Sequence, residues 1–190
     1  LKVFPQFNAS IDLAKEEMDD LIQNFLPNYN VAPTHLVPAI IQNDHSRKLT
    51  LLRWGLIPSW AKDEKIGFST INARSEDIAS KPAFKNLIPS QRCLIIADGF
   101  YEFRADGKVK HPVRYIMKDK SLFAFAGLFD RWKKSSNEII SSCTILTTEP
   151  NALVRKVHNR MPVMLMKENE SRWLDPALDS YEAIRSLLKS

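Results

Sequence analysis

Apolar residues follow two different spacings along this chain. Before Pro27 they recur at helical spacing after Ser10, a residue that can cap a helix, so we expect a helix between these two positions. After Pro27, short runs rich in β-branched and aromatic residues alternate with turn-like segments, which is typical of strands. The predicted strands cover residues 36–41, 49–54, 93–97, 100–103, 113–117, 123–129, 139–147 and 162–166, with turns at 104–108 and 133–138.

Helical spacing returns in short segments between and after these strands. They cover residues 72–80, 81–87, 150–157, 168–174 and 180–188, and the second and third open with proline near their first turn. Strands interrupted by short helices indicate an α+β protein whose core is a curved, mostly antiparallel sheet with a barrel-like form. No repeat or linker divides the chain, so we predict a single domain over residues 1–190.

The composition agrees with a folded domain. The 190 residues are 44% hydrophobic and 26% charged, as in an ordinary globular protein. No apolar run approaches the roughly 20 residues that span a bilayer, and the first residues lack the pattern of a signal peptide. We therefore expect a cytoplasmic protein with no membrane partner.

The charge balance points to an acidic partner. The net charge of +5 and the pI near 9.2 make nucleic acid the first candidate, although many soluble proteins carry such a charge. Cys93 and Cys143 lie in apolar runs, where a thiol behaves as a small hydrophobic group, and they indicate neither a disulfide framework nor a zinc site. The histidines are scattered, so no metal or other cofactor is predicted; they are His35, His45, His111 and His158.

A glutamate interrupts the aromatic run at residues 93–103. If this run forms strands, alternation places Phe100 and Glu102 on one face and the next aromatic residues on the other. Apolar surroundings disfavour the charged carboxylate and raise its pKa, which suits a group that moves protons near neutral pH. The alternative is a structural glutamate that pairs with an arginine at a sheet edge or faces water.

Two further segments offer polar groups beside predicted strands. His158 and Arg160 precede the last predicted strand, where a histidine can exchange protons and an arginine can hold a phosphate. Asn72 and Arg74 open the first predicted helical segment after Pro27, where asparagine would orient a reacting group and arginine would grip a phosphate. The simpler alternatives are a solvated loop for the first pair, and a helix cap with a solvated arginine for the second.

Aromatic and basic residues are interleaved in RWGLIPSWAKD at residues 53–63. Indole rings beside cations offer stacking surfaces for unpaired bases and a cationic path for a nucleic acid backbone. Trp54 ends an apolar run and is better explained as core, whereas Trp60 lies in a Pro-Ser-Trp loop and is the better stacking candidate. A Gly-rich phosphate loop and the Gly-x-Ser-x-Gly motif are both absent, which disfavours ordinary nucleotide enzymes and serine hydrolases.

Taken in order, these segments resemble the SOS response-associated peptidase (SRAP) family. The resemblance runs from about Tyr29 to Leu165 and rests on YNVAP, RWGLIPSWAKD, INARSE, KPAFKN, RCLIIADGFYEF, FAFAGLFDRW, TILTTEPNALV and HNRMPVML. It implies a single α+β domain with a curved β core and a positively charged groove for single-stranded DNA. Members of the family bond covalently to abasic sites in single-stranded DNA, through a cysteine exposed at the N-terminus once the initiator methionine is removed.

By this resemblance the catalytic residues are Asn72, Glu102 and His158. Asn72 would position the N-terminal residue, and His158 would assist opening of the sugar. Glu102 would serve the proton transfers of methionine removal and of adduct formation or reversal. The α-amine of the cysteine condenses with the open-chain aldehyde of the sugar and its thiol closes a thiazolidine, which traps the aldehyde more durably than an amine alone.

The resemblance also implies residues that bind DNA. Arg74 and Arg160 would hold the phosphates flanking the lesion, and Pro33 and Trp60 would line the groove near the bases. Phe103 stands where a tryptophan is common in the family, a change that keeps the site apolar. The expected partner is single-stranded DNA containing abasic sites, bound without cofactor or metal by a monomer that associates with the nucleoid when it is on DNA.

The chain departs from the family pattern at its two ends. It begins with Leu1 and has no cysteine before Cys93. Cys93 and Cys143 lack a free α-amine, so neither can take the role of an N-terminal cysteine. We therefore expect Met-Cys upstream of Leu1 in the intact protein and a closing segment after Ser190. The alternatives are a noncovalent single-stranded DNA-binding module and a peptidase that acts on other proteins.

Overall fold

The computed structural model describes residues 28–43 and 46–189, and the helix predicted between Ser10 and Pro27 lies outside them. The strands are β1 (Leu36–Asn43), β2 (Ser46–Trp54), β3 (Asn72–Arg74), β4 (Arg92–Ala97), β5 (Phe100–Asp106), β6 (Val109–Tyr115), β7 (Phe123–Lys133), β8 (Ile139–Thr148), β9 (Met161–Pro162) and β10 (Met164–Leu165). The α-helices are α2 (Lys167–Leu174) and α3 (Tyr181–Ile184), and the 3₁₀ helices are η2 (Glu64–Phe68), η3 (Lys85–Leu87), η4 (Val154–Lys156) and η5 (Arg185–Leu187).

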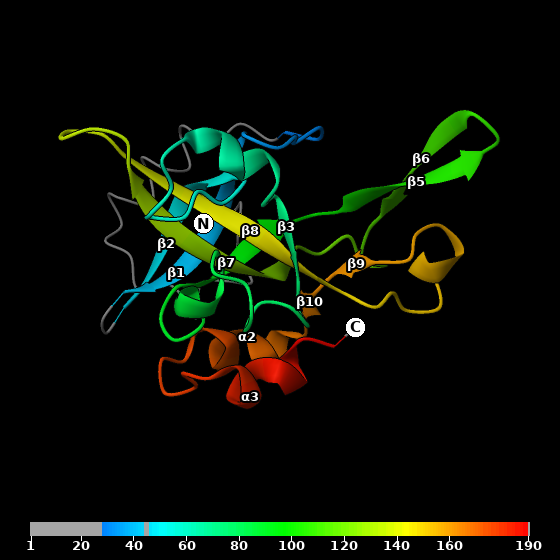
Figure 1. Ribbon diagram of the computed structural model, residues 1–190. Helices are drawn as coiled ribbons and strands as arrows, with labels where there is room; N and C mark the ends of the chain where they lie inside the picture. The colour runs from blue at the N-terminus through cyan, green and yellow to red at the C-terminus, as the bar shows by residue number, and fades with distance from the viewer. Residues whose placement is uncertain (1–27, 44–45, 190) are drawn as a thin grey trace.

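Strands β1, β2, β8, β7 and β4 pair in a closed ring (Figure 1). Strand β2 pairs with β8 in parallel, and the other pairings of the ring are antiparallel. Outside the ring, β3 and β9 pair with β8, and β10 pairs with β7. The predicted α+β class, with a curved and mostly antiparallel barrel-like core, is confirmed.

Alternation along the ring strands separates two hydrophobic clusters. In β1, Val37, Ala39 and Ile41 belong to one cluster, and Ile40 belongs to the other. Every buried member of the first cluster lies on a ring strand, so this cluster fills the interior of the ring. Gly127 faces the same interior, where a Cβ would lie 2.8 Å from a cysteine sulfur of β4, so the packing there requires glycine.

The second cluster joins the ring to the C-terminal helices. It includes Trp173 of α2, which is fully buried and donates from Nε1 to the carbonyl oxygen of Cys93 at 2.9 Å. Figure 1 shows α2 and α3 below the ring. The two helical segments predicted near the C-terminus are therefore confirmed. Within the described ranges, no helix is long and apolar enough to cross a membrane.

The other predicted helical segments after Pro27 differ in the structure. The helix expected at residues 72–80 is wrong, because Asn72–Arg74 form strand β3 and turns follow. Asn72 is therefore not a helix cap. Its backbone pairs with β8, and Ala73 is buried in the second cluster, so tertiary pairing outweighs the local helical pattern. The two proline-led segments contain only the 3₁₀ helices η3 and η4 among turns.

Strands β5 and β6 form a hairpin that projects from the ring (Figure 1). At its base, Phe100 stacks on Tyr115 with ring centroids 5.1 Å apart and packs edge-on against Phe125 of β7 at 5.9 Å. Gly99 precedes the hairpin, and a Cβ there would lie 2.8 Å from the carbonyl oxygen of Tyr115. Glycine therefore allows the break between β4 and β5 while the base of the hairpin stays fixed to the ring.

Candidate functional site

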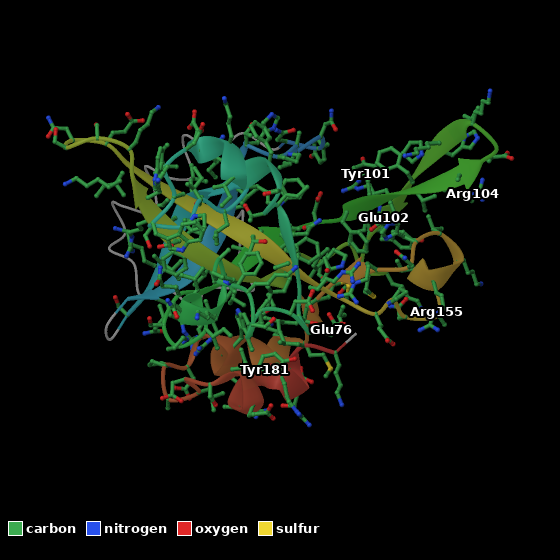
Figure 2. All side chains as sticks on the ribbon, viewed as in Figure 1. Glu76, Tyr101, Glu102, Arg104, Arg155 and Tyr181 are labelled. Atoms are coloured by element: carbon green, nitrogen blue, oxygen red, sulfur yellow. The ribbon has the colours of Figure 1, made fainter. Side chains whose placement is uncertain are left out.

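A cavity of about 270 Å³ lies where the end of β8 meets the base of the hairpin. In Figure 2, Glu102 lies on the hairpin, above Glu76. The cavity is lined by Asn72, Arg74, Glu102, Thr147, His158, Arg160, Met161 and Pro162. The structure thus brings together five of the residues singled out in the sequence, and it leaves Pro33 and Trp60 outside the lining.

Two short strands explain why distant parts of the chain meet here. Arg74 of β3 is paired with Thr147 of β8, and Thr147 is also paired with Pro162 of β9. A strand residue has one neighbour on each side, so β3 and β9 must flank the end of β8. The polar residues of the INAR and HNRMP segments are therefore carried to one place by backbone pairing.

Glu102 faces the cavity from the hairpin. Phe100 and Glu102 share the less exposed face of β5, and Tyr101 and Phe103 are exposed on the other, as alternation predicts. The Glu102 side chain is 19% exposed, and burial raises the pKa of its carboxyl while His158 opposes this. The ion pair expected with an arginine under the structural alternative is not formed by Glu102 in the described part of the chain; the ionisable neighbour is His158.

His158 is the ionisable neighbour of this carboxyl. Its Nδ1 lies 3.7 Å from Glu102 Oε1, and its side chain is 45% exposed. The same nitrogen lies 3.2 Å from the backbone N–H nitrogen of Arg160 and 3.0 Å from the carbonyl oxygen of that residue. The ring is therefore seated against the backbone of Arg160 while its edge stays open to solvent.

Arg160 is held by other protein groups. Its Nη1 and Nη2 donate to the two carboxylate oxygens of Glu76 at 2.9 and 2.8 Å, and Nη2 also donates to the carbonyl oxygen of Thr147 at 2.6 Å. This bidentate pair lowers the pKa of Glu76. Phosphate binding by Arg160 stays a prediction, and the guanidinium that would perform it already has protein partners.

Asn72 and Arg74 differ from Arg160 in this respect. Both side chains are exposed at the cavity, on either side of the buried Ala73. Neither side chain has a hydrogen-bond or ion-pair partner among residues 28–43 and 46–189. An amide and a guanidinium in this condition are available to a ligand.

Trp60 and Pro33 lie outside this cavity, and their predicted contacts with DNA stay predictions. Trp60 is 58% exposed, and the loop that carries it is fixed by two groups of β7. Asp130 accepts from the backbone N–H of Ser59 at 2.7 Å, and Trp132 donates from Nε1 to the carbonyl oxygen of Ala61 at 2.6 Å. The exposed indole thus lies on a loop that is hydrogen-bonded to β7 on both sides of Trp60.

Trp54 and the cysteines have the core positions expected from their apolar runs. Trp54 packs against the cluster inside the ring and donates to the carbonyl oxygen of Ile71 at 2.8 Å. Cys93 and Cys143 are fully buried, and burial raises the pKa of both thiols. Across the described ranges, no group of three or more histidine, cysteine or acidic residues is placed to hold a metal ion.

Sequence reasoning missed Glu76 and the lining residues Thr147, Met161 and Pro162. Glu76 ends the INARSE segment two residues after Arg74, so the signal was an acid beside a candidate cationic site. Its arginine partner lies 84 residues away, and local pattern carries no information about such a pair. Thr147 ends an apolar run, and its place in the cavity lining becomes evident only from the pairing of β3 and β9 with β8.

A carboxyl with a raised pKa, an imidazole beside it, and an unpaired amide and guanidinium can transfer protons and receive an anionic group. Fold and site together define a single-domain α+β protein with a barrel-like sheet and an acid–base cavity at the end of one ring strand. The chain belongs to the SOS response associated peptidase (SRAP) family, whose sequence pattern matches residues 5–190. The resemblance seen in the sequence is thereby confirmed.

Relatives and solved structures agree with this assignment. Abasic site processing protein YoqW of Bacillus subtilis strain 168 is 45% identical over 185 residues, which cover 91% of this chain and 83% of that protein. Abasic site processing protein HMCES of Gallus gallus is 31% identical over 197 residues, covering 85% and 59%. The crystal structure of a protein from Bacteroides thetaiotaomicron has a TM-score of 0.84 at 32% identity, and the match covers 97% of this chain and 81% of that chain.

Proposed function

We propose that this protein processes abasic sites in DNA. Relatives from Bacillus subtilis and Gallus gallus are named abasic site processing proteins. The observation that carries the proposal is the cavity itself, where the Glu102 carboxyl with its raised pKa lies 3.7 Å from His158 Nδ1, beside unpaired Asn72 and Arg74. These groups suit the proton transfers of aldehyde chemistry and the phosphate next to a lesion.

The proposed substrate is an abasic site in single-stranded DNA. Pockets for drug-sized ligands usually measure about 300–1,000 Å³, so a cavity of about 270 Å³ suits a smaller group such as a sugar without its base. The net charge of +5 favours the phosphate backbone, and the exposed Trp60 offers a stacking surface for an unpaired base.

The reaction proposed is covalent capture by an N-terminal cysteine that precedes Leu1 in the intact protein. Its α-amine attacks the aldehyde carbon of the opened sugar, and loss of water leaves an imine. The thiol then adds across the carbon–nitrogen double bond, its proton passes to nitrogen, and a thiazolidine closes. The buried Cys93 and Cys143 are unsuited to this role, because their thiols resist ionisation and carry no α-amine.

The residues of the cavity then have distinct tasks. Glu102 gives a proton to the oxygen that leaves as water, and the same carboxyl serves removal of the initiator methionine. His158 assists opening of the sugar, Asn72 orients the N-terminal residue, and Arg74 holds a flanking phosphate. A carboxyl with a raised pKa is suited to the first task because it keeps its proton to higher pH than an ordinary glutamate.

The test is incubation of the full-length protein with an abasic single-stranded oligonucleotide, followed by a denaturing gel. We expect a slow-migrating adduct, and no adduct with the same oligonucleotide after its aldehyde has been reduced to an alcohol. Absence of any adduct that survives denaturation would refute covalent capture. Salt-sensitive binding without an adduct would then support a noncovalent module, and peptide release from an unrelated protein would support a general peptidase.

A further inference from the structure

We propose that Glu76 is a positioning residue that sets the orientation of His158 through Arg160. Glu76 lies in the turn after β3 and does not line the cavity. Its two oxygens accept from Arg160 Nη1 and Nη2 at 2.9 and 2.8 Å. Such a pair fixes the plane of the guanidinium as well as its position, because both bonds must form together.

The pair is anchored to the end of β8. The carbonyl oxygen of Thr147 accepts from Arg160 Nη2 at 2.6 Å and from the backbone N–H of Ser75 at 2.9 Å. The Arg160 side chain is 20% exposed, whereas that of Glu76 is 49% exposed. The hydrogen bond from Arg160 lowers the pKa of Glu76, so its carboxylate stays charged well below neutral pH. The turn after β3, the end of β8 and the loop before β9 are thus tied together at one guanidinium.

Arg160 transmits this restraint to His158 through its backbone. Its N–H nitrogen and its carbonyl oxygen lie 3.2 and 3.0 Å from His158 Nδ1. Glu102 Oε1 lies 3.7 Å from that same nitrogen. A displacement of Arg160 therefore changes the distance and the angle between the imidazole and the carboxyl on which proton transfer depends.

Glu76 also limits how Arg160 can meet an anion. A guanidinium has five N–H hydrogens, and three of them are directed at Glu76 and Thr147. The Nε atom is buried and has no partner among the described residues. One Nη1 hydrogen remains for a phosphate while Glu76 is in place, so a bidentate grip would require release of Glu76. The positioning role and a phosphate-gripping role therefore predict opposite effects of removing the Glu76 charge.

The test compares Glu76→Gln with the matched control Asp77→Asn. Asp77 is the next residue, and its carboxylate pairs with Lys81 at 3.4 Å instead of with Arg160. Each substitution replaces one carboxylate by an amide, so the two variants change the net charge equally. The amide of Glu76→Gln retains the size of the side chain but turns an N–H group toward one guanidinium nitrogen, which breaks the bidentate pair. In ¹⁵N-labelled protein without DNA, we expect the NMR chemical shifts of the His158 ring nitrogens to change in Glu76→Gln and to match wild type in Asp77→Asn. Identical His158 signals in all three proteins would overturn the positioning role.

The consequence for adduct formation rests on the proposed function and is measured separately. With full-length protein, we expect Glu76→Gln to slow adduct formation about 10-fold, since small misplacements of reacting groups are costly, and to bind DNA as Asp77→Asn does. Tighter DNA binding by Glu76→Gln at an unchanged rate would show instead that Glu76 restrains a phosphate-gripping arginine, and would overturn the proposal. If no protein forms an adduct, the proposed function fails, while the His158 signals still decide the role of Glu76.

Discussion

Among the residues that the structure describes, two glutamates have carboxyl groups whose pKa is raised by burial, and one of the two faces the cavity. Glu170 of α2 is 7% exposed, and burial raises its pKa to about 7 against the opposing effects of Lys167 and Arg47. Glu102 is also partly buried, and its opposing charge is His158. A raised pKa is therefore shared by both regions and does not by itself identify a functional group.

The surroundings separate the two groups. Glu102 opens onto a cavity that is also lined by the imidazole of His158 and by unpaired polar side chains. Glu170 belongs to the helix seam, which we define as the buried residues Glu170 and Trp173 of α2 together with Arg92 of β4. There, Arg92 is 3% exposed and donates to backbone carbonyls, including that of Trp173. The cavity is open to solvent, whereas the helix seam attaches α2 to the ring.

The substitution Glu102→Gln should produce the largest effect and should separate the regions most clearly. Loss of the proton donor is expected to slow adduct formation about 100-fold or more, because general acid–base groups contribute 10²–10⁴-fold. The free energy of unfolding at pH 7 should stay within about 0.5 kcal/mol of wild type or rise, since no buried charge remains. Single-turnover gels and urea unfolding measure the two quantities. An unchanged rate would place the essential acid elsewhere.

The substitution Arg92→Leu should have the opposite pattern. The Arg92 guanidinium donates to the carbonyl oxygens of Trp173 and Asp175 and lies 5.7 Å from the Trp173 ring, so its loss leaves buried acceptors unpaired. We expect a loss of about 2–4 kcal/mol in the free energy of unfolding and a Tm lower by about 5–15 °C. Well below that Tm, the adduct rate should match wild type. A slower rate in fully folded protein would mean that the helix seam and the cavity are coupled.

Glu170 itself predicts how stability depends on pH. A carboxyl with a raised folded pKa holds its proton in the folded state after the unfolded chain has lost it, so stability falls as pH rises from about 4.5 toward 7. We expect Glu170→Gln to remove about 1–2 kcal/mol of that fall, allowing for partial hydration of the group. Urea unfolding at several pH values measures this, with Glu168→Gln on the same helix as the control. If the free energy of unfolding changed equally with pH in the two variants, the prediction would be wrong.

Local pattern was sufficient for the ring strands and for the orientation of Glu102. The apolar runs predicted the strands because each buries alternate residues in two clusters, and the alternation around Glu102 followed from strand geometry alone. Trp54 was placed in the core for the same reason. The helices at the C-terminus followed from their spacing, which tertiary contacts reinforce through Trp173.

The convergence of the cavity residues could not be derived from local pattern. It depends on β3 and β9 flanking Thr147, and β3 is far from β8 in sequence. The same pairing places Asn72–Arg74 in a strand, in place of the start of the helix predicted at 72–80. The pair of Glu76 and Arg160 is equally nonlocal, at 84 residues. Family resemblance identified the candidate residues. Only the geometry shows that Arg160 is paired with Glu76, whereas Arg74 is exposed and unpaired among the described residues.

That distinction leads to the smallest predicted effect, which separates binding from proton transfer within the cavity. If exposed Arg74 makes one phosphate contact, Arg74→Ala should weaken binding of undamaged single-stranded DNA about 5- to 10-fold and reduce the salt slope by about 0.7. At saturating DNA its adduct rate should remain near wild type, unlike that of Glu102→Gln.

The matched control is Arg131→Ala, which removes an arginine that lies over Phe129 of β7 and does not line the cavity. Titrations of a fluorescent oligonucleotide at several salt concentrations measure, for each variant, the slope of log affinity against log salt concentration. Equal slopes for the two variants would mean that Arg74 acts only through net charge. A smaller slope for Arg74→Ala alone would assign it a phosphate, and would leave Glu102 and His158 as the groups that determine the rate of the chemical step.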